Sequence, residues 1–399
     1  MTDLTEGNEG KLIWHFAIPM LIGNVFQQLY NVADSIVVGQ LLPNGKEALA
    51  AVGASFPVLF TIASLIIGVS SGTTIIIAQY FGAKDFTKIK KAVDTMFIML
   101  FFSSILAGGL GVYFSETIFR YIELPEELIP DAVLYFNINM IGIVTMFGFN
   151  GISGVLRGFG DSKTPLYFLI LSTILNIILD LVFVLAFGWG IAGVAWATVI
   201  AQGFSFVIGV WYLNKTHKLI SISIFKLEFD WDIFAKSIKI GLPSGLQHMF
   251  VAMGMVALFR IVNSFGTNVI AAYSVAGRID SFAIMPAMNF AMALTTFTGQ
   301  NLGANKPHRV INGLKATLFM TAIISVSFSL AAILFGKQLM HMFTADPEVI
   351  LIGAEYLVIV GVFYVVFSTM FSINAVFRGA GDTIVPMFIT LFSLWAIRV

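Results

Sequence analysis

LRGFGDSKTP, Leu156 to Pro165, occurs a second time near the other end of the chain as FRGAGDTIVP, Phe377 to Pro386. The two copies share an Arg, two Gly, an Asp and a Pro, each 221 residues apart. The same shift carries AQYFGAK (Ala78–Lys84) onto GQNLGAN (Gly299–Asn305). This period is much longer than that of a solenoid repeat. The repeat therefore indicates one bundle of elements that was duplicated.

The composition is typical of a polytopic membrane protein. Of the 399 residues, 58% are hydrophobic and 11% are charged, whereas an ordinary globular domain has about 25% charged residues. The net charge is zero, so no global basic field is available for nucleic acid. The chain has no cysteine and no Walker, HExxH or GxSxG motif. We therefore expect neither an enzyme nor a nucleic-acid-binding protein.

Apolar runs long enough to cross a bilayer, at about 20 residues each, recur along the chain. Their apolarity is uniform, which predicts helices, because the strands of a membrane barrel would alternate. We therefore expect an all-α polytopic membrane protein. The predicted spans are 13–38, 49–79, 92–114, 132–155, 166–187, 191–213, 240–263, 269–299, 312–335, 351–376 and 384–399.

The positive charges of the loops predict the orientation. With the N-terminus inside, most Lys and Arg residues fall in inner segments, and only Lys46, Arg120 and Lys337 fall in outer loops. The acidic start TDLTEGNEG differs from the basic start of a signal peptide, so the first span is expected to be retained. We expect a multi-pass plasma membrane protein with a cytoplasmic N-terminus.

The repeat predicts two lobes. Six spans per repeat would start both lobes on the same side, related by a pseudo-two-fold axis along the membrane normal. We predict an N-lobe at 1–213 (spans 1 to 6), a cytoplasmic linker at 214–239 and a C-lobe at 240–399. The stretch from Pro386 to Val399 supplies about 21 Å of helix, against a hydrocarbon core of about 30 Å. The second six-helix lobe is therefore expected to be truncated to about five helices.

Three carboxylates fall inside predicted spans, where a charge is costly and marks a functional candidate. They are Asp34 in span 1, Asp180 in span 5 and Asp280 in span 8. Asn176 precedes Asp180 by one helical turn and shares its face. Oxygen ligands suit a hard cation, and a buried carboxylate can instead carry a proton. The alternative is structural: each Asp only bonds a neighbouring helix, or Asp280 pairs with Arg278.

Further side chains in spans 7 and 8 allow two interpretations. His248 either packs through a hydrogen bond or lines a cavity. Met253 and Met288 belong to a group of methionines that suits a promiscuous pocket, although methionine often only packs. The RGxGD turns are interpreted as structural, with Asp161 capping the next helix. An intramembrane aspartyl protease would need two carboxylates in contact, and both copies of the motif lie in loops.

Long stretches resemble the MATE family of multidrug and toxic compound extrusion transporters, in its bacterial branches. The resemblance rests on IPMLIGNVFQQLYNVADSIVVGQ, ALAAVGASFP, IAQYFGAKD, LRGFGDSKTPLYFLILSTILNIILD and the second RGAGD. It implies two six-helix lobes with a cleft that opens alternately to each side. It also implies export of organic cations and other drugs in exchange for Na⁺ or H⁺.

The resemblance also implies site residues. The first-lobe cation site would use Asp34, Asn176, Asp180 and Thr198, which would hold Na⁺ if the protein is sodium-coupled. Asn150 matches another polar position that lines this lobe. In span 7, Gln247 and His248 stand where some members have a Glu, and Asp280 falls at a span 8 acid of the family. Together with Met253 and Met288 they are the predicted cavity residues.

We therefore expect a monomeric exporter of cationic or amphiphilic small molecules, coupled to Na⁺ or H⁺ and without another cofactor. One alternative is a flippase for lipid-linked precursors, for which Arg260 and Arg278 are the available intramembrane arginines. The other alternative is an inactive truncated transporter.

Overall fold

The computed structural model describes residues 2–216, 222 and 226–398. Within these ranges the secondary structure is helical and no strand occurs, which confirms the predicted all-α class. The predicted linker at 214–239 falls partly outside the described residues, at 217–221 and 223–225.

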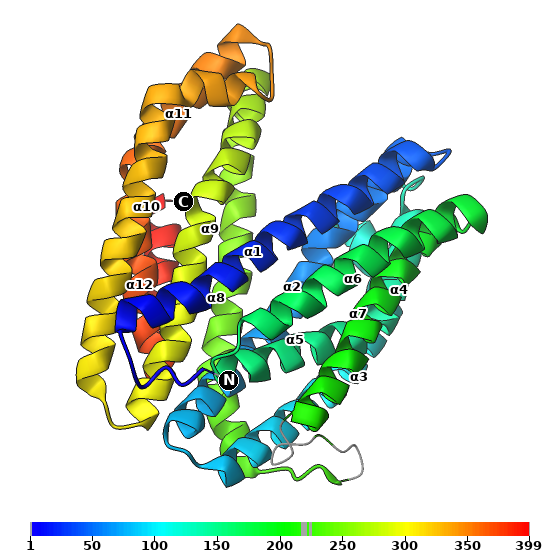
Figure 1. The fold of residues 1–399 in the computed structure, drawn as a ribbon. Coiled ribbons are helices and arrows are strands. Elements are labelled where there is room, and N and C mark those ends of the chain that lie inside the picture. Colours follow the sequence, from blue (N-terminus) through cyan, green and yellow to red (C-terminus); the bar gives the residue numbers. More distant parts are fainter. Residues whose placement is uncertain (1, 217–221, 223–225, 399) are drawn as a thin grey trace. The chain divides into compact units, whose positions relative to one another are not determined.

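One compact unit consists of Ile22–Leu246 with Thr2. Its core gathers around the fully buried rings of Phe119, Phe136 and Phe147, the first two packed edge to face at 5.6 Å. The helices that contribute to this unit are α1 (Glu9–Ile36, from Ile22), η1 (Val37–Leu41), α2 (Gly45–Gly82), α3 (Phe86–Tyr121), α4 (Ile129–Ile141), α5 (Ile143–Gly158), α6 (Lys163–Leu181), η2 (Val182–Ala186), α7 (Gly190–Thr216) and the first part of α8 (Trp231–Asn263) (Figure 1).

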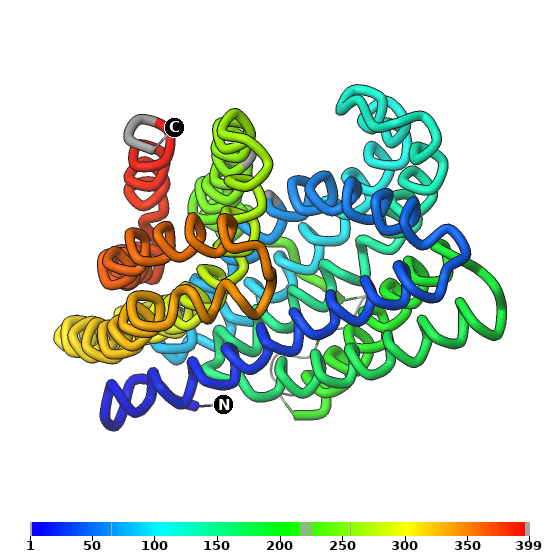
Figure 2. Tube along the Cα trace, turned by 90° about the horizontal axis from the view of Figure 1, so that it is seen from above, coloured from blue at the N-terminus to red at the C-terminus, as the bar shows by residue number. Residues whose placement is uncertain are grey.

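The second compact unit consists of Asp3–Leu21 with Gln247–Val399. Its core has two clusters, one around Phe290 and Phe297 and the other around Met340 and Leu357. Figure 2 shows its last two elements as one continuous coil (red). Its helices are the first part of α1, the second part of α8, α9 (Thr267–Gly303), α10 (Pro307–His341), α11 (Pro347–Val362), α12 (Tyr364–Ala380), α13 (Ile384–Leu391) and η5 (Phe392–Arg398). The two compact units are defined by which residues pack together, whereas the predicted lobes are defined by the sequence repeat. The bounds of the lobes therefore stay a prediction.

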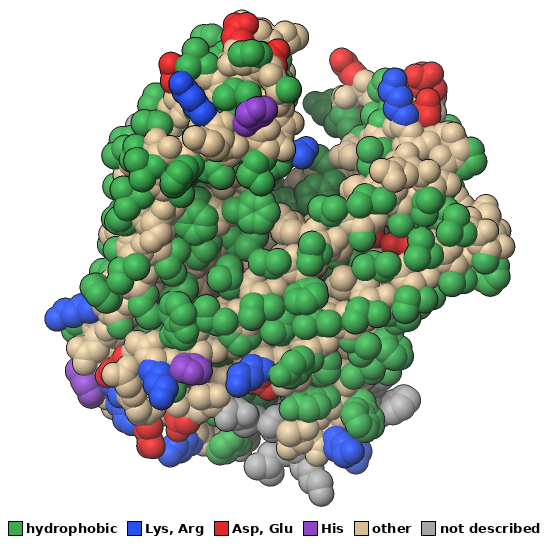
Figure 3. All heavy atoms as spheres, turned by 45° about the horizontal axis from the view of Figure 1, so that its top comes forward, with side chains coloured by type: hydrophobic (Ala, Val, Ile, Leu, Met, Phe, Trp, Pro, Cys, Tyr) green, Lys and Arg blue, Asp and Glu red, His purple; other side chains and the backbone are tan. Residues whose placement is uncertain are grey.

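The helices match the predicted spans closely. Among the described residues, eight helices are long and apolar enough to cross a bilayer, and ten spans result if each bent pair counts as one. The bent pairs are α4–α5, at 49°, and α11–α12, at 46°. The last predicted span corresponds to a shorter apolar segment, Ile384–Trp395. Hydrophobic side chains are also far more widespread than charged ones on the visible surface (Figure 3), as expected where lipid replaces water.

The two RGxGD turns have the predicted structural role. Asp161 accepts hydrogen bonds from the backbone N–H of Lys163 and of Thr164, each at 3.0 Å, and so caps the start of α6. In the second copy, Asp382 accepts from the backbone N–H of Ile384 at 3.2 Å. The glycine before each Asp has a positive φ, 76° at Gly160 and 92° in the second copy, which favours glycine.

Glycines let α2 and the first part of α8 touch through their backbones. A Cβ on Gly68 would lie 2.4 Å from Gly245 Cα, and one on Gly241 would lie 2.4 Å from Val69 Cα. One turn along α2, a Cβ on Gly72 would lie 2.5 Å from a backbone oxygen of α8. Small residues four apart on both helices are the usual device for close packing in membranes. This crossing fixes the start of α8 within the first unit.

Candidate functional site

The structure brings the acids of spans 1 and 5 together in the first unit. Asp34 lies on α1, and Asn176 and Asp180 lie one turn apart on α6. With its amide nitrogen turned toward the acids, Asn176 donates to Asp34 Oδ1 at 2.9 Å and to Asp180 Oδ2 at 3.3 Å. Asn176 and Asp180 are fully buried, whereas Asp34 is half-buried. One amide group therefore links two carboxylates from separate helices.

A hydroxyl pair extends this cluster to α7. The Tyr30 hydroxyl and the Thr198 hydroxyl are 2.9 Å apart, and Thr198 Oγ1 donates to Val194 O at 3.2 Å. Either hydroxyl can be the donor of this pair. Tyr30 precedes Asp34 by one helical turn and therefore shares its face. Thr198, the predicted fourth site residue, thus contacts α1 through a tyrosine.

Two aromatic residues of this cluster, Tyr30 and Tyr135, were not predicted from the sequence. Tyr30 could have been found from its spacing of four residues before Asp34. Tyr135, on α4, lies within electrostatic range of both Asp34 and Asp180. It belongs to another span, and no spacing in the sequence connects it to the acids.

One oxygen of the cluster is unsatisfied. Asp180 Oδ1 is buried and has no hydrogen-bond partner among the described residues. A buried carboxylate oxygen without a partner is costly, and a proton or a cation would remove that cost. Across the described ranges, no three His, Asp or Glu side chains form a metal-binding group. A cation here would therefore use the two carboxylates together with neutral oxygens such as that of Thr198, a donor set that suits Na⁺ chemically.

The second unit holds its own buried acid. Asp280, on α9, accepts hydrogen bonds from the Tyr356 hydroxyl of α11 at 3.1 Å and from the Tyr364 hydroxyl of α12. These contacts join three helices around one carboxylate. The acid was predicted from the sequence but neither tyrosine was, because both follow Asp280 by more than seventy residues.

The remaining predicted cavity residues differ in their neighbours and in their exposure. Gln247 is buried, donates to Thr390 Oγ1 at 2.6 Å and accepts from Arg378 Nη2 at 2.6 Å. Its amide therefore ties α8 to α12 and α13. Asn150 donates to Met146 O of its own helix at 2.9 Å. His248 is partly exposed, and the side chains of Met253 and Met288 are exposed.

Apolar helices of spanning length and carboxylates buried among them define a polytopic α-helical membrane protein. The MatE family model matches residues 19–182 and 243–399, and the chain belongs to this family, which confirms the resemblance seen in the sequence. Members of the family are transporters.

Curated relatives match almost the whole chain. It is 36% identical over 396 residues to the probable multidrug resistance protein YpnP of Bacillus subtilis, covering 99% of this chain and 88% of the relative. It is 32% identical to the probable multidrug resistance protein YoeA of the same organism, with the same coverage. It is 24% identical to the FAD transporter of Shewanella oneidensis, covering 95% of this chain and 85% of that protein.

Solved structures show the same fold. The chain is similar to a MATE crystallised in complex with MaD3S, with a TM-score of 0.91 and 27% identity over 99% of this chain and 88% of that one. It is also similar to a multidrug resistance MATE family transporter of the MOP superfamily in an outward-facing conformation. That TM-score is 0.89, with 26% identity over 98% of this chain and 87% of that one.

Proposed function

We propose that this chain is a multidrug efflux transporter that exports cationic or amphiphilic small molecules in exchange for Na⁺ or H⁺. Two relatives at 36% and 32% identity are named probable multidrug resistance proteins, which supports this substrate class. The observation that carries the coupling proposal is the bridge of Asn176 between the carboxylates of Asp34 and Asp180.

The chemistry of the pair supports exchange. Two carboxylates that share one amide donor repel each other when both are charged. Binding of one proton or one Na⁺ reduces this repulsion and stabilises the pair. An organic cation that enters the same region would compete for that negative charge. Binding of the coupling ion then weakens binding of the cargo. A ligand shifts the equilibrium between transport states only by its differential affinity for them.

The coupling ion would bind at a small set of residues. Asp34 and Asp180 would supply charged oxygens and Thr198 a hydroxyl oxygen. Asn176 donates to both acids in the present arrangement, so it would either orient them or turn its carbonyl toward a Na⁺. The proposed cavity residues for the cargo are Asn150, Gln247, His248, Met253, Asp280 and Met288.

The distribution of Lys and Arg supports a plasma membrane location with the N-terminus inside, and we propose a monomer. The chain has no cysteine, so single cysteines can report the orientation. Glu6→Cys should react with an impermeant maleimide only after the cells are opened, and Glu127→Cys should react in intact cells. The opposite labelling pattern would contradict the proposed cytoplasmic N-terminus. Size-exclusion chromatography with light scattering would measure the oligomeric state.

Asp34→Asn tests the proposed function. In cells that express the full chain, this change should abolish efflux of a lipophilic cationic dye. Asp232→Asn, in the exposed first turn of α8, is the matched control and should leave efflux unchanged. Normal efflux by Asp34→Asn at normal expression would contradict the proposal. Neither a flippase nor an inactive remnant is favoured by the names of the relatives.

A further inference from the structure

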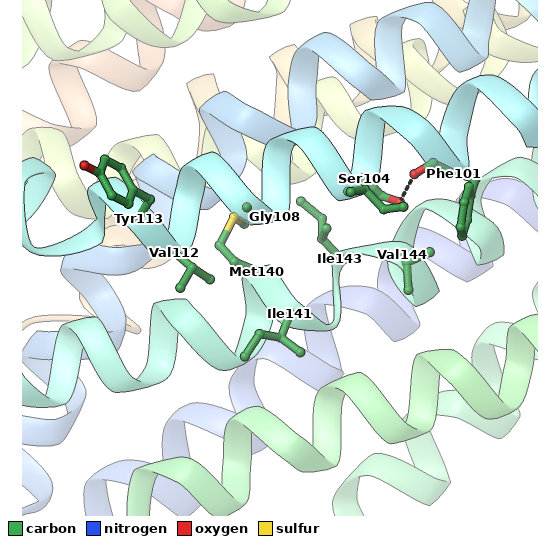
Figure 4. A pocket seen from close by; sticks show the side chains of 11 residues that line it. Phe101, Ser104, Gly108, Val112, Tyr113, Met140, Ile141, Ile143 and Val144 are labelled. Atoms are coloured by element: carbon green, nitrogen blue, oxygen red, sulfur yellow. Dashed lines mark hydrogen bonds between the residues drawn. The ribbon is translucent and has the colours of Figure 1, made fainter.

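A long apolar groove crosses the surface of the first unit between α3 and the break that separates α4 from α5 (Figure 4). We call it the α3–α4 groove. Its volume is about 520 Å³, and its lining runs from Phe101 to Tyr113 on α3 and from Met140 to Val144 across the break. Among the lining side chains, the Ser104 hydroxyl is already used, because it donates to Phe101 O at 2.7 Å. The interior of the groove therefore suits an apolar ligand.

Two features of the backbone create the groove. At Gly108 the helices meet, since a Cβ there would lie 2.7 Å from Met140 O. Gly109 also belongs to the lining, and a Cβ there would meet no atom within 4 Å, so the space beside it is open. The bend of 49° between α4 and α5 turns the chain at Gly142, and glycine is a frequent site of such kinks.

The groove is continuous with a surface that faces lipid. On α3 the neighbouring side chains Phe102 and Leu106 are 65% and 64% exposed. The helix that carries them, Phe86–Tyr121, is long and apolar enough to span a membrane, and the chain belongs to a family of membrane transporters. Hydrocarbon chains are therefore the surroundings of the groove.

We propose that the α3–α4 groove binds one acyl chain of a membrane phospholipid. From Phe101 to Tyr113, α3 rises by about 18 Å at 1.5 Å per residue. One leaflet contributes roughly 15 Å of the hydrocarbon core of about 30 Å. The groove thus has the length of a single acyl chain from one leaflet. The residues that line it carry no charge, so the headgroup lies beyond its end.

The binding depends on packing. A lipid tail is already in an apolar solvent, so entering the groove gives it little hydrophobic gain. What the groove adds is close contact on several sides, which an annular lipid on a smooth helix face lacks. The chain in the groove should therefore be enriched over bulk lipid and should exchange slowly.

Gly109→Leu is the test variant, because Gly109 lines the groove, a Cβ there meets no atom within 4 Å, and the larger side chain is intended to fill the groove. Gly53→Leu is the matched control: Gly53 is an exposed helical glycine on α2, and a Cβ there also meets no atom within 4 Å. Each protein is placed in nanodiscs of phosphatidylethanolamine that contains a photoreactive diazirine in one acyl chain. After irradiation, mass spectrometry locates the labelled residues.

We expect labelling to concentrate on the exposed side chains of the lining, at Ile141 and Val144, and to fall at least several-fold in Gly109→Leu but not in Gly53→Leu. Even labelling along the exposed face of α3, or unchanged labelling in Gly109→Leu, would overturn the proposal. If the leucine variant does not fold, Gly109→Met serves with the same readout.

Discussion

With its amide nitrogen turned toward the acids, Asn176 donates to Asp34 Oδ1 at 2.9 Å and so joins α6 to α1 inside the first unit. The same nitrogen lies 3.3 Å from Asp180 Oδ2. A neutral amide is thus the link between two acids whose charges repel, and the link changes when either acid gains a proton or a cation. This relationship connects the occupancy of the site to the contact between two helices.

Asn176→Ala should destabilise the protein and weaken its response to the coupling ion. The change removes the donor from two carboxylates, and a buried acceptor left without its donor costs about 1–3 kcal/mol. Thermal unfolding of the purified protein, with and without added Na⁺ and at two pH values, measures both effects. Asn268→Ala is the control, since Asn268 lies in the second unit, where its amide donates to Glu348 Oε2 at 2.7 Å. Equal stability of the wild type and Asn176→Ala would argue against the bridge.

Tyr30→Phe and Thr198→Val should show strong coupling in a double-mutant cycle. Each change removes the same hydrogen bond between α1 and α7, which is 2.9 Å long. A typical hydrogen bond contributes about 1 kcal/mol, and residues in contact show non-additive effects. The double mutant should therefore lose less stability than the sum of the two single changes. Additive losses would mean that the two hydroxyls do not interact.

Gly241→Leu should prevent normal folding of the first unit. The added side chain would start 2.4 Å from Val69 Cα, a backbone atom that cannot move aside. Gly277→Leu is the matched control, because a Cβ there meets no atom within 4 Å. Expression level and the size-exclusion profile compare the two variants. A monodisperse Gly241→Leu protein in normal yield would contradict the close crossing of α2 and α8.

The carboxylate of Asp230 should make the folded protein less stable as the pH becomes acidic. The backbone N–H of Ile233 donates to Asp230 at 3.1 Å and, with a contribution from Lys91, holds the pKa of Asp230 below its usual value. A lowered pKa means that the carboxylate stabilises the folded state above the unfolded pKa of about 3.9. This contribution is lost as the pH falls through the folded value. Asp230→Asn keeps a capping oxygen and should flatten the loss of stability below about pH 4. Thermal unfolding between pH 3 and pH 7 measures it, and identical curves would exclude this role.

The helices and the duplication of the bundle could be predicted, because the helices follow from uniform apolarity and the duplication from a fixed spacing in the sequence. Uniform apolar runs indicated helices, and the shift of 221 residues from Arg157 to Arg378 indicated a duplicated bundle. The breaks inside α4–α5 and α11–α12 were not predicted, because each run is apolar on both sides of the break. At the first break a single Gly142 turns the chain, and glycine is common throughout these helices.

The site residues that could be predicted are those whose side chains are costly to bury in a membrane. A carboxylate in an apolar run is conspicuous, so Asp34, Asp180 and Asp280 were identified from the sequence. Tyrosine is ordinary in a membrane helix, so the partners Tyr30 and Tyr356 were not. Which helices face one another decides these contacts, and neither spacing nor composition contains that information.

Ion movement through the site of Asp34 and Asp180 is proposed to drive the movement of cargo. The most direct measurement uses the purified full chain in liposomes, with an imposed Na⁺ gradient in one set and an imposed proton gradient in sodium-free buffer in another. We predict that at least one gradient drives a cationic dye against its own concentration gradient in the wild type, and that neither does so in Asp34→Asn. Equal dye movement in both proteins, or none in the wild type under either gradient, would contradict the account.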